Sequence, residues 1–151
     1  ARPIHSVRWN GDRSGVPMQV IEVAAGLIKR DNRYLIARRK AGVHLAGFWE
    51  FPGGKREAGE SLADCLRREL WEELRIRIDS PILYQIVRHE YSDKVVELHF
   101  FHCVIEQGEP VSLGCDEIRW VFPEELTQFT FPPADYAVIQ SLQRETSGVS
   151  R

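Results

Sequence analysis

Apolar and polar residues alternate along much of this chain, a pattern that predicts β-strands. Five segments have the composition and spacing of strands, and they are 20–28, 33–39, 81–91, 94–105 and 118–122. The run Lys29–Asn32 between the first two segments favours a turn, so these two segments are expected to form a β-hairpin. Ser92 and Asp93 separate the third segment from the fourth.

A helical period replaces this alternation between residues 61 and 74. The apolar positions of this segment recur every four residues and are Leu62, Leu66, Leu70 and Leu74. They form one stripe, which should pack on a sheet. Ser61 stands at the start and, with Asp64 three residues on, resembles a capping box. A second helix is predicted over 133–143.

The length and composition of the chain fit one globular domain. The chain has 151 residues, of which 43% are hydrophobic and 28% are charged, and a domain of this size buries about two thirds of its unfolded surface. Residues 18–145 carry the regular pattern, residues 1–17 are expected to be a mobile extension, and residues 146–151 a short tail. Residues 1–17 either belong to the natural protein or precede a natural start at Met18.

Charge and hydropathy narrow the classes of partner. No run of about 18 apolar residues and no charged-then-apolar leader appears, so a cytoplasmic monomer without a membrane span is the expectation. The net charge of -2 argues against a nucleic-acid polymer, because phosphate backbones require clustered Lys and Arg. His99 and His102 are three residues apart on a predicted strand and therefore face opposite sides, which argues against a metal site shared by the two.

Three glutamates crowd one edge of the helix predicted over 61–74. At about 100° per residue, Glu69, Glu72 and Glu73 fall within a narrow arc beside the apolar stripe. Like charges at these spacings destabilise a helix, and partial burial raises that cost. A cation among the carboxylates would offset the repulsion. The alternative is a solvated acidic surface neutralised by arginines of the same helix.

The glycine-rich loop before this helix favours the cation. Gly53 and Gly54 let the backbone come close to a bound group, and Gly59 permits a positive φ where the loop enters the helix. Carboxylates and a backbone carbonyl are hard oxygen ligands, which suit Mg²⁺ or Mn²⁺ rather than Zn²⁺. Such ions usually complete their shell with water and substrate phosphate, so the implied substrate is a phosphate ester.

The same segment resembles the Nudix box, a motif with seven constrained positions. Gly54 is followed after five residues by Glu60, after seven more by the run 68–73 (RELWEE), and then by Ile76. The family's box has a glycine before that last apolar residue, where this chain has Arg75. In a left-handed conformation at a helix end, arginine costs roughly 1 kcal/mol more than glycine. The departure concerns the helix cap and not the acidic residues.

The resemblance extends to the MutT-type branch of the Nudix family and covers about residues 19–143. Similar features are the paired arginines Arg38-Arg39, His44, and the runs 49–55 (WEFPGGK) and 131–135 (FPPAD). The resemblance implies an α+β fold, a Nudix-type α/β/α sandwich around a mixed β-sheet. It also implies sanitation of the nucleotide pool by hydrolysis of a nucleoside triphosphate of the 8-oxo-dGTP kind. The products would be the monophosphate and pyrophosphate, and the cofactor Mg²⁺ or Mn²⁺.

The resemblance also assigns roles to the acidic residues. The implied metal ligands are the Gly53 carbonyl, Glu69, Glu72, Glu73 and an acid of a late loop, for which Glu117 is the candidate and Asp116 the alternative. Arg68 is expected to orient a carboxylate. A carboxylate must take the proton of the attacking water, and Glu69 is the first candidate for this base and Glu60 the second. The alternative for Glu60 is that it only pairs with Arg68.

Four further residues are candidates for contact with the substrate. Arg39 and His44 either touch its phosphate or sugar or are structural. Trp49 either stacks on the base or packs among the neighbouring aromatic residues. Asp135 stands where the MutT pattern usually has Asn, and an ionised Asp only accepts hydrogen bonds. Guanine and 8-oxoguanine offer an N1–H and an amine to such an acceptor.

Three classes of function compete on this evidence. The first is a catalytic Nudix pyrophosphohydrolase, with a cytidine triphosphate or general nucleotide enzyme as the alternative to 8-oxo-dGTP. The second is a non-catalytic domain that recognises a damaged base, and the third is a structural domain with an acidic helix. Three intact, crowded glutamates favour the first, because a binding module has no reason to keep them.

Overall fold

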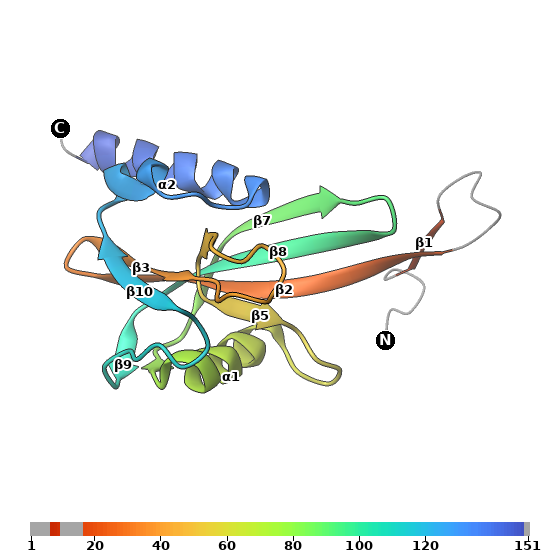
Figure 1. Ribbon diagram of the computed structural model, residues 1–151, viewed down its shortest axis with the longest axis horizontal. Helices are drawn as coiled ribbons and strands as arrows, with labels where there is room; N and C mark the ends of the chain where they lie inside the picture. Colours follow the sequence, from red (N-terminus) through yellow and green to blue (C-terminus); the bar gives the residue numbers. More distant parts are fainter. Residues whose placement is uncertain (1–6, 10–16, 150–151) are drawn as a thin grey trace.

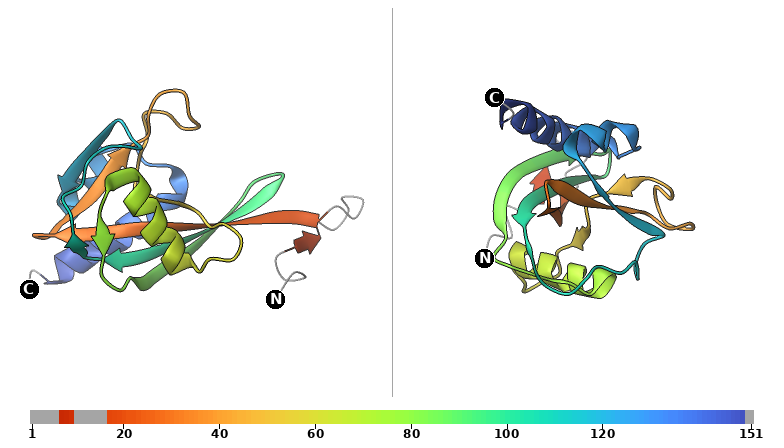
Figure 2. Two further views of the ribbon diagram at one scale, coloured as in Figure 1. Left: turned by 90° about the horizontal axis from the view of Figure 1, so that it is seen from below. Right: turned by 90° about the vertical axis from the view of Figure 1, so that its left-hand side faces the viewer.

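A mixed β-sheet between two helices forms the protein. The computed structural model describes residues 7–9 and 17–149. Helix α1 (Leu62–Leu74) covers one face of the sheet and helix α2 (Tyr136–Val149) covers the other (Figure 1). Figure 2 shows the same three layers from two further directions. The expected α+β fold, an α/β/α sandwich with a mixed sheet, is confirmed.

The strands of the described residues form one large sheet and one small one. In chain order the strands are β1 (Val7–Trp9), β2 (Pro17–Arg30), β3 (Arg33–Arg38), β4 (Trp49–Glu50), β5 (Gly53–Lys55), β6 (Arg77–Ile78), β7 (Ile82–Glu90), β8 (Lys94–Cys103), β9 (Ile105–Gln107) and β10 (Glu117–Val121). The large sheet has the order β10-β3-β2-β8-β7, and β1 and β5 pair with β2 while β4 pairs with β3. Strands β2 and β8 run parallel and the other pairs antiparallel, which makes the sheet mixed.

The predicted hairpin between residues 20 and 39 is confirmed, with a tighter turn than expected. Asp31 and Asn32 both have positive φ, 54° and 64°, as a two-residue turn that matches the twist of the flanking strands requires. Arg30 pairs with Arg33 and so still belongs to β2. Aspartate and asparagine tolerate this left-handed conformation better than most residues do.

The second half of strand β2, from Ala24 to Ile28, is buried on both faces and separates two hydrophobic clusters. Ala25 and Leu27 pack with α2 residues such as Leu142. The alternate residues Ala24 and Ile28 pack with the apolar stripe of α1. Burial on both faces explains why this strand reads as a nearly continuous apolar run.

Helix α1 begins at the predicted cap. The Ser61 hydroxyl accepts a hydrogen bond from the Asp64 backbone N–H at 3.0 Å, which satisfies one free donor of the first turn. The Asp64 carboxylate pairs with Arg67 at 3.1 Å instead of returning to Ser61. Only half of the predicted capping box is therefore formed.

Helix α1 ends with Arg75 in the left-handed conformation for which the Nudix box has a glycine. Arg75 is left-handed, with φ 58° and ψ 39°, and its backbone N–H donates to the Trp71 carbonyl. Its guanidinium Nη1 donates to the same carbonyl at 2.8 Å. The side chain thus caps the helix while its backbone is in a conformation that favours glycine.

Replacing Arg75 by glycine is expected to give a protein about 1 kcal/mol more stable than the Arg75→Ala variant. Both substitutions remove the bond to Trp71, so the difference between them reports the backbone strain alone. Urea unfolding of the two variants, with equal m-values, measures this difference. Equal stabilities would show that residue 75 is not left-handed in solution.

Two parts of the chain differ from the sequence-based expectation. Val7–Trp9 lies within the predicted extension but forms β1, which pairs antiparallel with the start of β2. Helix α2 continues to Val149, six residues beyond its predicted end, so most of the predicted tail is helical. Residues 1–6, 10–16 and 150–151, where the expected mobility and the rest of the tail fall, lie outside the described residues. Within the described ranges, neither helix is long and apolar enough to cross a membrane.

Candidate active site

Two glycines bring strand β5 against helix α1 and strand β2. A Cβ on Gly54 would lie 2.3 Å from Cδ of Glu69, and a Cβ on Gly53 would lie 1.9 Å from the Ala24 carbonyl oxygen. No side chain fits at either position. The backbone of Gly54 therefore lies against the Glu69 side chain, and the expected approach of this backbone to a bound group stays a prediction.

Arg68 holds three glutamates of the Nudix box in place. Its Nε and Nη2 donate to the two carboxylate oxygens of Glu60 at 3.1 and 2.8 Å. Its Nη1 donates to Glu69 at 3.0 Å and to Glu72 at 3.3 Å. The bidentate bond from Arg68 lowers the pKa of Glu60 to about 2. The expected role of Arg68 in orienting carboxylates and the alternative role of Glu60 as its ion-pair partner both fit this geometry.

Glu69, Glu73 and Glu50 form a second group of carboxylates. Of these three, only Glu69 accepts a hydrogen bond from Arg68. Burial, followed by the negative charges of Glu69 and Glu50, raises the pKa of Glu73 to about 8. Burial also raises the pKa of Glu50, although the hydrogen bond from Arg39 opposes this. Burial is the larger cause of both shifts, and the closeness of the three carboxylates adds to the shift of Glu73.

Glu50 is the residue of this group that sequence reasoning missed. It lies between Trp49 and Phe51, in the aromatic stretch before the glycine loop. A single acidic residue between two aromatic residues, three positions before Gly53, is the only local signal for it. Its part in the site depends on the fold, because β4 places it beside Arg39 and the helix carboxylates.

The donors of this region fit a hard divalent cation. They are partly buried carboxylates that lie close together, and the glycine backbone of β5 lies directly against one of them, Glu69. Mg²⁺ and Mn²⁺ prefer such oxygen ligands. Of the predicted ligands, Glu69 and Glu73 lie together. Gly53 is the neighbour of Gly54, whose backbone contacts Glu69. Glu72 lies on the same helix, where it forms an ion pair with Arg68.

Glu117, the predicted late-loop ligand, is placed among arginines. Its carboxylate lies 2.6 Å from Nε of Arg119 and 3.5 Å from Nη1 of Arg38. The hydrogen bond from Arg119 lowers the pKa of Glu117. Asp116, the alternative, lies 3.9 Å from Arg38. The loop before them does reach α1, where the Gly114 N–H donates to the Glu73 carbonyl at 3.2 Å, so a role of Glu117 as a ligand stays a prediction.

In metal-free protein, Glu73 is expected to make stability fall as the pH rises. Its pKa is about 8 when folded and 4.5 ordinarily, so between these values the folded state holds a proton that the unfolded state has lost. We expect the Glu73→Gln variant to be more stable than the wild type at pH 8 by about 1–2 kcal/mol, after allowance for solvent screening of a half-buried group.

Unfolding in EDTA at pH 5 and pH 8 tests this expectation. The difference between wild type and Glu73→Gln isolates Glu73, because every other titrating group is common to both. A difference that does not grow toward pH 8 would contradict the expectation. With Mg²⁺ present, the same variant is expected to lose turnover, because the substitution removes a predicted ligand.

A pocket of about 250 Å³ opens on the α2 face of the sheet, next to these carboxylates. Its lining includes the predicted substrate residues Arg39, His44 and Asp135, together with Glu50 and Gly53. Arg39 donates to the His44 carbonyl at 2.6 Å and to Glu50 at 2.8 Å, so it fixes one wall. Asp135 is only 5% exposed. Burial, assisted by the charge of Glu50, raises the pKa of Asp135 to about 7.

Trp49, the fourth predicted substrate residue, is not part of the pocket lining. Its ring is buried and meets Phe129 edge-on, with a centroid distance of 5.2 Å. The guanidinium groups of Arg38 and Arg119 lie 5.8 and 5.6 Å from its centroid. This placement fits the packing alternative, and stacking of Trp49 on a substrate base stays a prediction.

Comparison with known proteins identifies the family. The model of the NUDIX domain matches residues 23–141. The chain belongs to the Nudix family. Members of this family act on nucleotide substrates and generally use a divalent metal ion.

Nudix relatives with stated activities cover most of the chain. A CTP pyrophosphohydrolase of Escherichia coli (strain K12) is 36% identical over 124 residues, which are 82% of this chain and 92% of the relative. An 8-oxo-dGTP diphosphatase of Haemophilus influenzae is 38% identical over 130 residues, 85% of this chain and 95% of the relative. The solution structure of the E. coli ORF135 protein matches with a TM-score of 0.76 at 34% identity, over 87% of this chain and 94% of that one.

Proposed function

We propose that this Nudix protein is a Mg²⁺-dependent pyrophosphohydrolase that converts a nucleoside triphosphate into the monophosphate and pyrophosphate. The supporting observation is that the side chains of Glu50, Glu69 and Glu73 lie close together and partly buried, beside a pocket that is lined by Glu50 and by a buried Asp135. A domain that only recognises bases needs the pocket, but it does not need these carboxylates. Two relatives, one named a CTP pyrophosphohydrolase and the other an 8-oxo-dGTP diphosphatase, support the same reading.

The residues that would hold Mg²⁺ are Glu69, Glu72, Glu73 and the Gly53 carbonyl, with Glu117 of the late loop as a further ligand. When bound, Mg²⁺ neutralises phosphate charge and makes a coordinated water more acidic, and Mn²⁺ can supply the same chemistry. Arg68 keeps Glu69 and Glu72 oriented before the ion arrives. Arg39 lines the pocket as a cation for the substrate phosphate or sugar.

Glu69 is the general base of this proposal. A base must accept a proton from the attacking water, so a carboxylate whose proton affinity is strongly depressed is a poor choice. The pKa of Glu60 is lowered to about 2 by Arg68, which makes it a positioning partner of that arginine. Glu69 lies against the Gly54 backbone, at the boundary between α1 and the pocket. Glu69 would take the proton of the attacking water while the water oxygen bonds to phosphorus and the P–O bond of the oxygen that bridges the α- and β-phosphoryl groups breaks, which gives the monophosphate and pyrophosphate.

Asp135 is the residue that selects the base. It is buried in the wall of the pocket, where its carboxyl group can pair with a hydrogen-bond donor of the substrate base. Without Asp135, that donor would be buried with no partner. Guanine and 8-oxoguanine present two adjacent donors, N1–H and the amine, to one carboxylate. An oxidised guanine triphosphate is therefore the proposed substrate, in nucleotide-pool sanitation. A cytidine triphosphate is the second candidate, because cytosine also offers an amine and a 36% identical relative is a CTP pyrophosphohydrolase.

A substrate screen with product identification tests the proposal. Purified full-length chain is incubated with 8-oxo-dGTP, dGTP, dATP, dCTP and CTP, with Mg²⁺ or with EDTA, and the products are separated by chromatography. Mg²⁺-dependent release of pyrophosphate with the highest kcat/KM for 8-oxo-dGTP is the expected result. Release of orthophosphate, or no turnover in Mg²⁺, would contradict the enzymatic proposal. The highest kcat/KM for CTP or dCTP would select the second candidate.

A further inference from the structure

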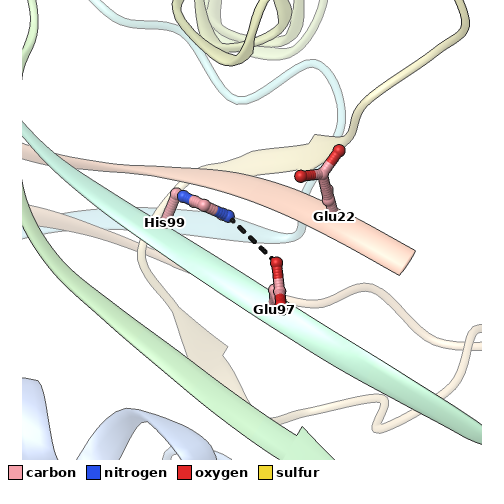
Figure 3. Close-up of side chains that lie close together, drawn as sticks. All are labelled: Glu22, Glu97 and His99. Carbon is pink, nitrogen blue, oxygen red and sulfur yellow. Dashed lines mark ion pairs between the residues drawn. The ribbon is translucent and has the colours of Figure 1, made fainter. Parts of the chain in front are cut away.

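Glu22, Glu97 and His99 form a cluster that shares no residue with the proposed active site. Glu97 and His99 are two residues apart on β8 and so share a face of the sheet. Glu22 lies on the parallel neighbour β2, directly opposite Glu97. A carboxylate oxygen of each glutamate and an imidazole nitrogen of His99 all lie within 4.8 Å of one another. Figure 3 shows the three side chains converging between the two strands.

The cluster lies on the face of the sheet opposite to the nucleotide pocket. Phe101 and Cys103, which alternate with the same period as Glu97 and His99, pack in the α1 cluster. Leu98 and Phe100, the intervening residues, line the pocket on the α2 face. The sheet therefore separates the Glu22, Glu97 and His99 side chains from the substrate pocket.

His99 supplies the observation that points to a ligand. Its side chain is buried, with the residue 8% exposed, and its Nε2 has no hydrogen-bond partner among the described residues. The nearest carboxylate oxygen, Oε1 of Glu97, is 3.7 Å away, beyond hydrogen-bond distance. Figure 3 shows the imidazole directed at that carboxylate. Buried polar atoms without a partner are rare in folded proteins, and a bound ion is one standard reason for them.

An arginine donates a hydrogen bond to each of the two glutamates of the cluster. Nε of Arg56 lies 2.7 Å from Oε1 of Glu22, and Nη1 of Arg88 lies 3.0 Å from Oε2 of Glu97. The remaining oxygens, Oε2 of Glu22 and Oε1 of Glu97, form no hydrogen bond to any described residue. Partners behind the ligands orient metal-binding side chains in the same way. Each carboxylate thus keeps one oxygen available without breaking its ion pair.

We infer that Glu22, Glu97 and His99 bind a first-row transition-metal ion of the Zn²⁺ type. One imidazole nitrogen and two carboxylate oxygens suit Zn²⁺ and its neighbours, whereas Mg²⁺ prefers oxygen ligands alone. Tetrahedral Zn²⁺ with bonds of about 2.0–2.1 Å places its ligand atoms about 3.3 Å apart. The side chains must therefore close by about 1 Å or a little more from their present spacing, within the reach of glutamate rotamers. Three protein ligands leave a fourth position for water.

The bound ion would connect the sheet to the loop that carries Glu60. It would join β2 to β8 through Glu22 and Glu97. Arg56, the partner of Glu22, also donates to the Glu60 carbonyl at 3.1 Å, in the loop that enters α1. Zn²⁺ is therefore expected to raise the unfolding temperature of the protein.

A zinc titration of the full-length chain tests the site. Wild type, His99→Gln, Glu22→Gln and the matched control His102→Gln are titrated with Zn²⁺ against a chromophoric chelator, in excess Mg²⁺. His102 is the control because it lies on the same strand but on the opposite face, in contact with Tyr84. Glu22→Gln is included because Glu22 is only half-buried, so its variant retains the fold even where a change at His99 is destabilising. Imidazole NMR signals of His99 and His102 are followed in parallel.

The wild type and His102→Gln are expected to bind one more Zn²⁺ per chain than His99→Gln, and Glu22→Gln to bind that ion at least tenfold more weakly. The His99 imidazole signals should shift while those of His102 stay in place. Equal Zn²⁺ binding by all four proteins, or no binding by the wild type, would overturn the inference. None of these readouts depends on turnover, so the result is independent of the proposed hydrolase activity.

Discussion

Replacing Glu69 by glutamine is expected to lower kcat by a factor of about 10²–10⁴ and to leave the protein folded. The amide has nearly the shape of the carboxylate, but it accepts a proton poorly and is a weaker ligand for a hard cation. The position is also confined, because Gly54 packs directly on the Glu69 side chain and Arg68 donates to it at 3.0 Å. Pyrophosphate release in Mg²⁺ measures the loss, and urea unfolding checks the fold.

The Glu60→Gln variant is the matched control for this expectation. Glu60 accepts hydrogen bonds from the same arginine as Glu69, namely Arg68. Its pKa is lowered to about 2, so it is a weak base. Its loss leaves Arg68 bonded to Glu69 and Glu72. We therefore expect a smaller fall in kcat than for Glu69→Gln. A larger fall in the Glu60 variant, with Glu69→Gln nearly active, would reverse the assignment of the base.

Local patterns predicted the part of the site that lies within one stretch of sequence. The leucine stripe fixes which face of α1 is buried, and so places Glu69 and Glu73 at its edge. Ser61 fixes where the helix starts, and Gly54 is required by the contact with Glu69. Each of these depends on residues fewer than about twenty positions apart, for which helix geometry alone determines the neighbours.

Contacts between distant segments could not be predicted in the same way. Glu50 joins the site only because the two-residue strand β4 pairs with β3, and so short a strand leaves no alternation to detect. Glu22 and His99 meet only because β2 and β8 pair in parallel in one particular register. A shift of that register by one residue would move Glu97 and His99 relative to Glu22, and no local signal sets it.

Trp49 and Glu117 show a related limit. The sequence places Trp49 next to the glycine loop, where a stacking role and a packing role are equally compatible with its position. Its direction follows from Phe129, which lies 80 residues later and covers the ring. For Glu117, the sequence shows an acid near a late strand but not the two arginines that engage it.

Base discrimination is expected to depend on pH through Asp135, and this expectation rests on the proposed function. Burial raises the pKa of Asp135 to about 7 from an ordinary value of 3.8. Below pH 7 the carboxyl group is protonated, so it can both donate and accept hydrogen bonds. Above pH 7 it is ionised and only accepts. Its hydrogen-bonding character therefore changes within the range in which the enzyme can be assayed.

The preference for 8-oxo-dGTP and dGTP over dATP is accordingly expected to rise between pH 6 and pH 8. Guanine-type bases present two donors, which the ionised carboxylate accepts, whereas adenine also needs a donor opposite its N1. The Asp135→Asn variant both donates and accepts at every pH, so its preference should stay constant over this range. Asp135→Ala should lower discrimination by about 10–100-fold and lower the maximal rate less, because an unpaired buried donor costs about 1–3 kcal/mol.

Ratios of kcat/KM, measured for mixed substrates at each pH, separate this effect from changes in the catalytic groups. The ionisations of Glu69, Glu73 and bound metal ligands act on the phosphates, which all substrates share, so they cancel in the ratio. Only a group that contacts the base can make the ratio vary with pH. A wild-type ratio that is constant from pH 6 to pH 8, or an Asp135→Asn ratio that varies as the wild type does, would remove Asp135 from the base-binding wall of the pocket.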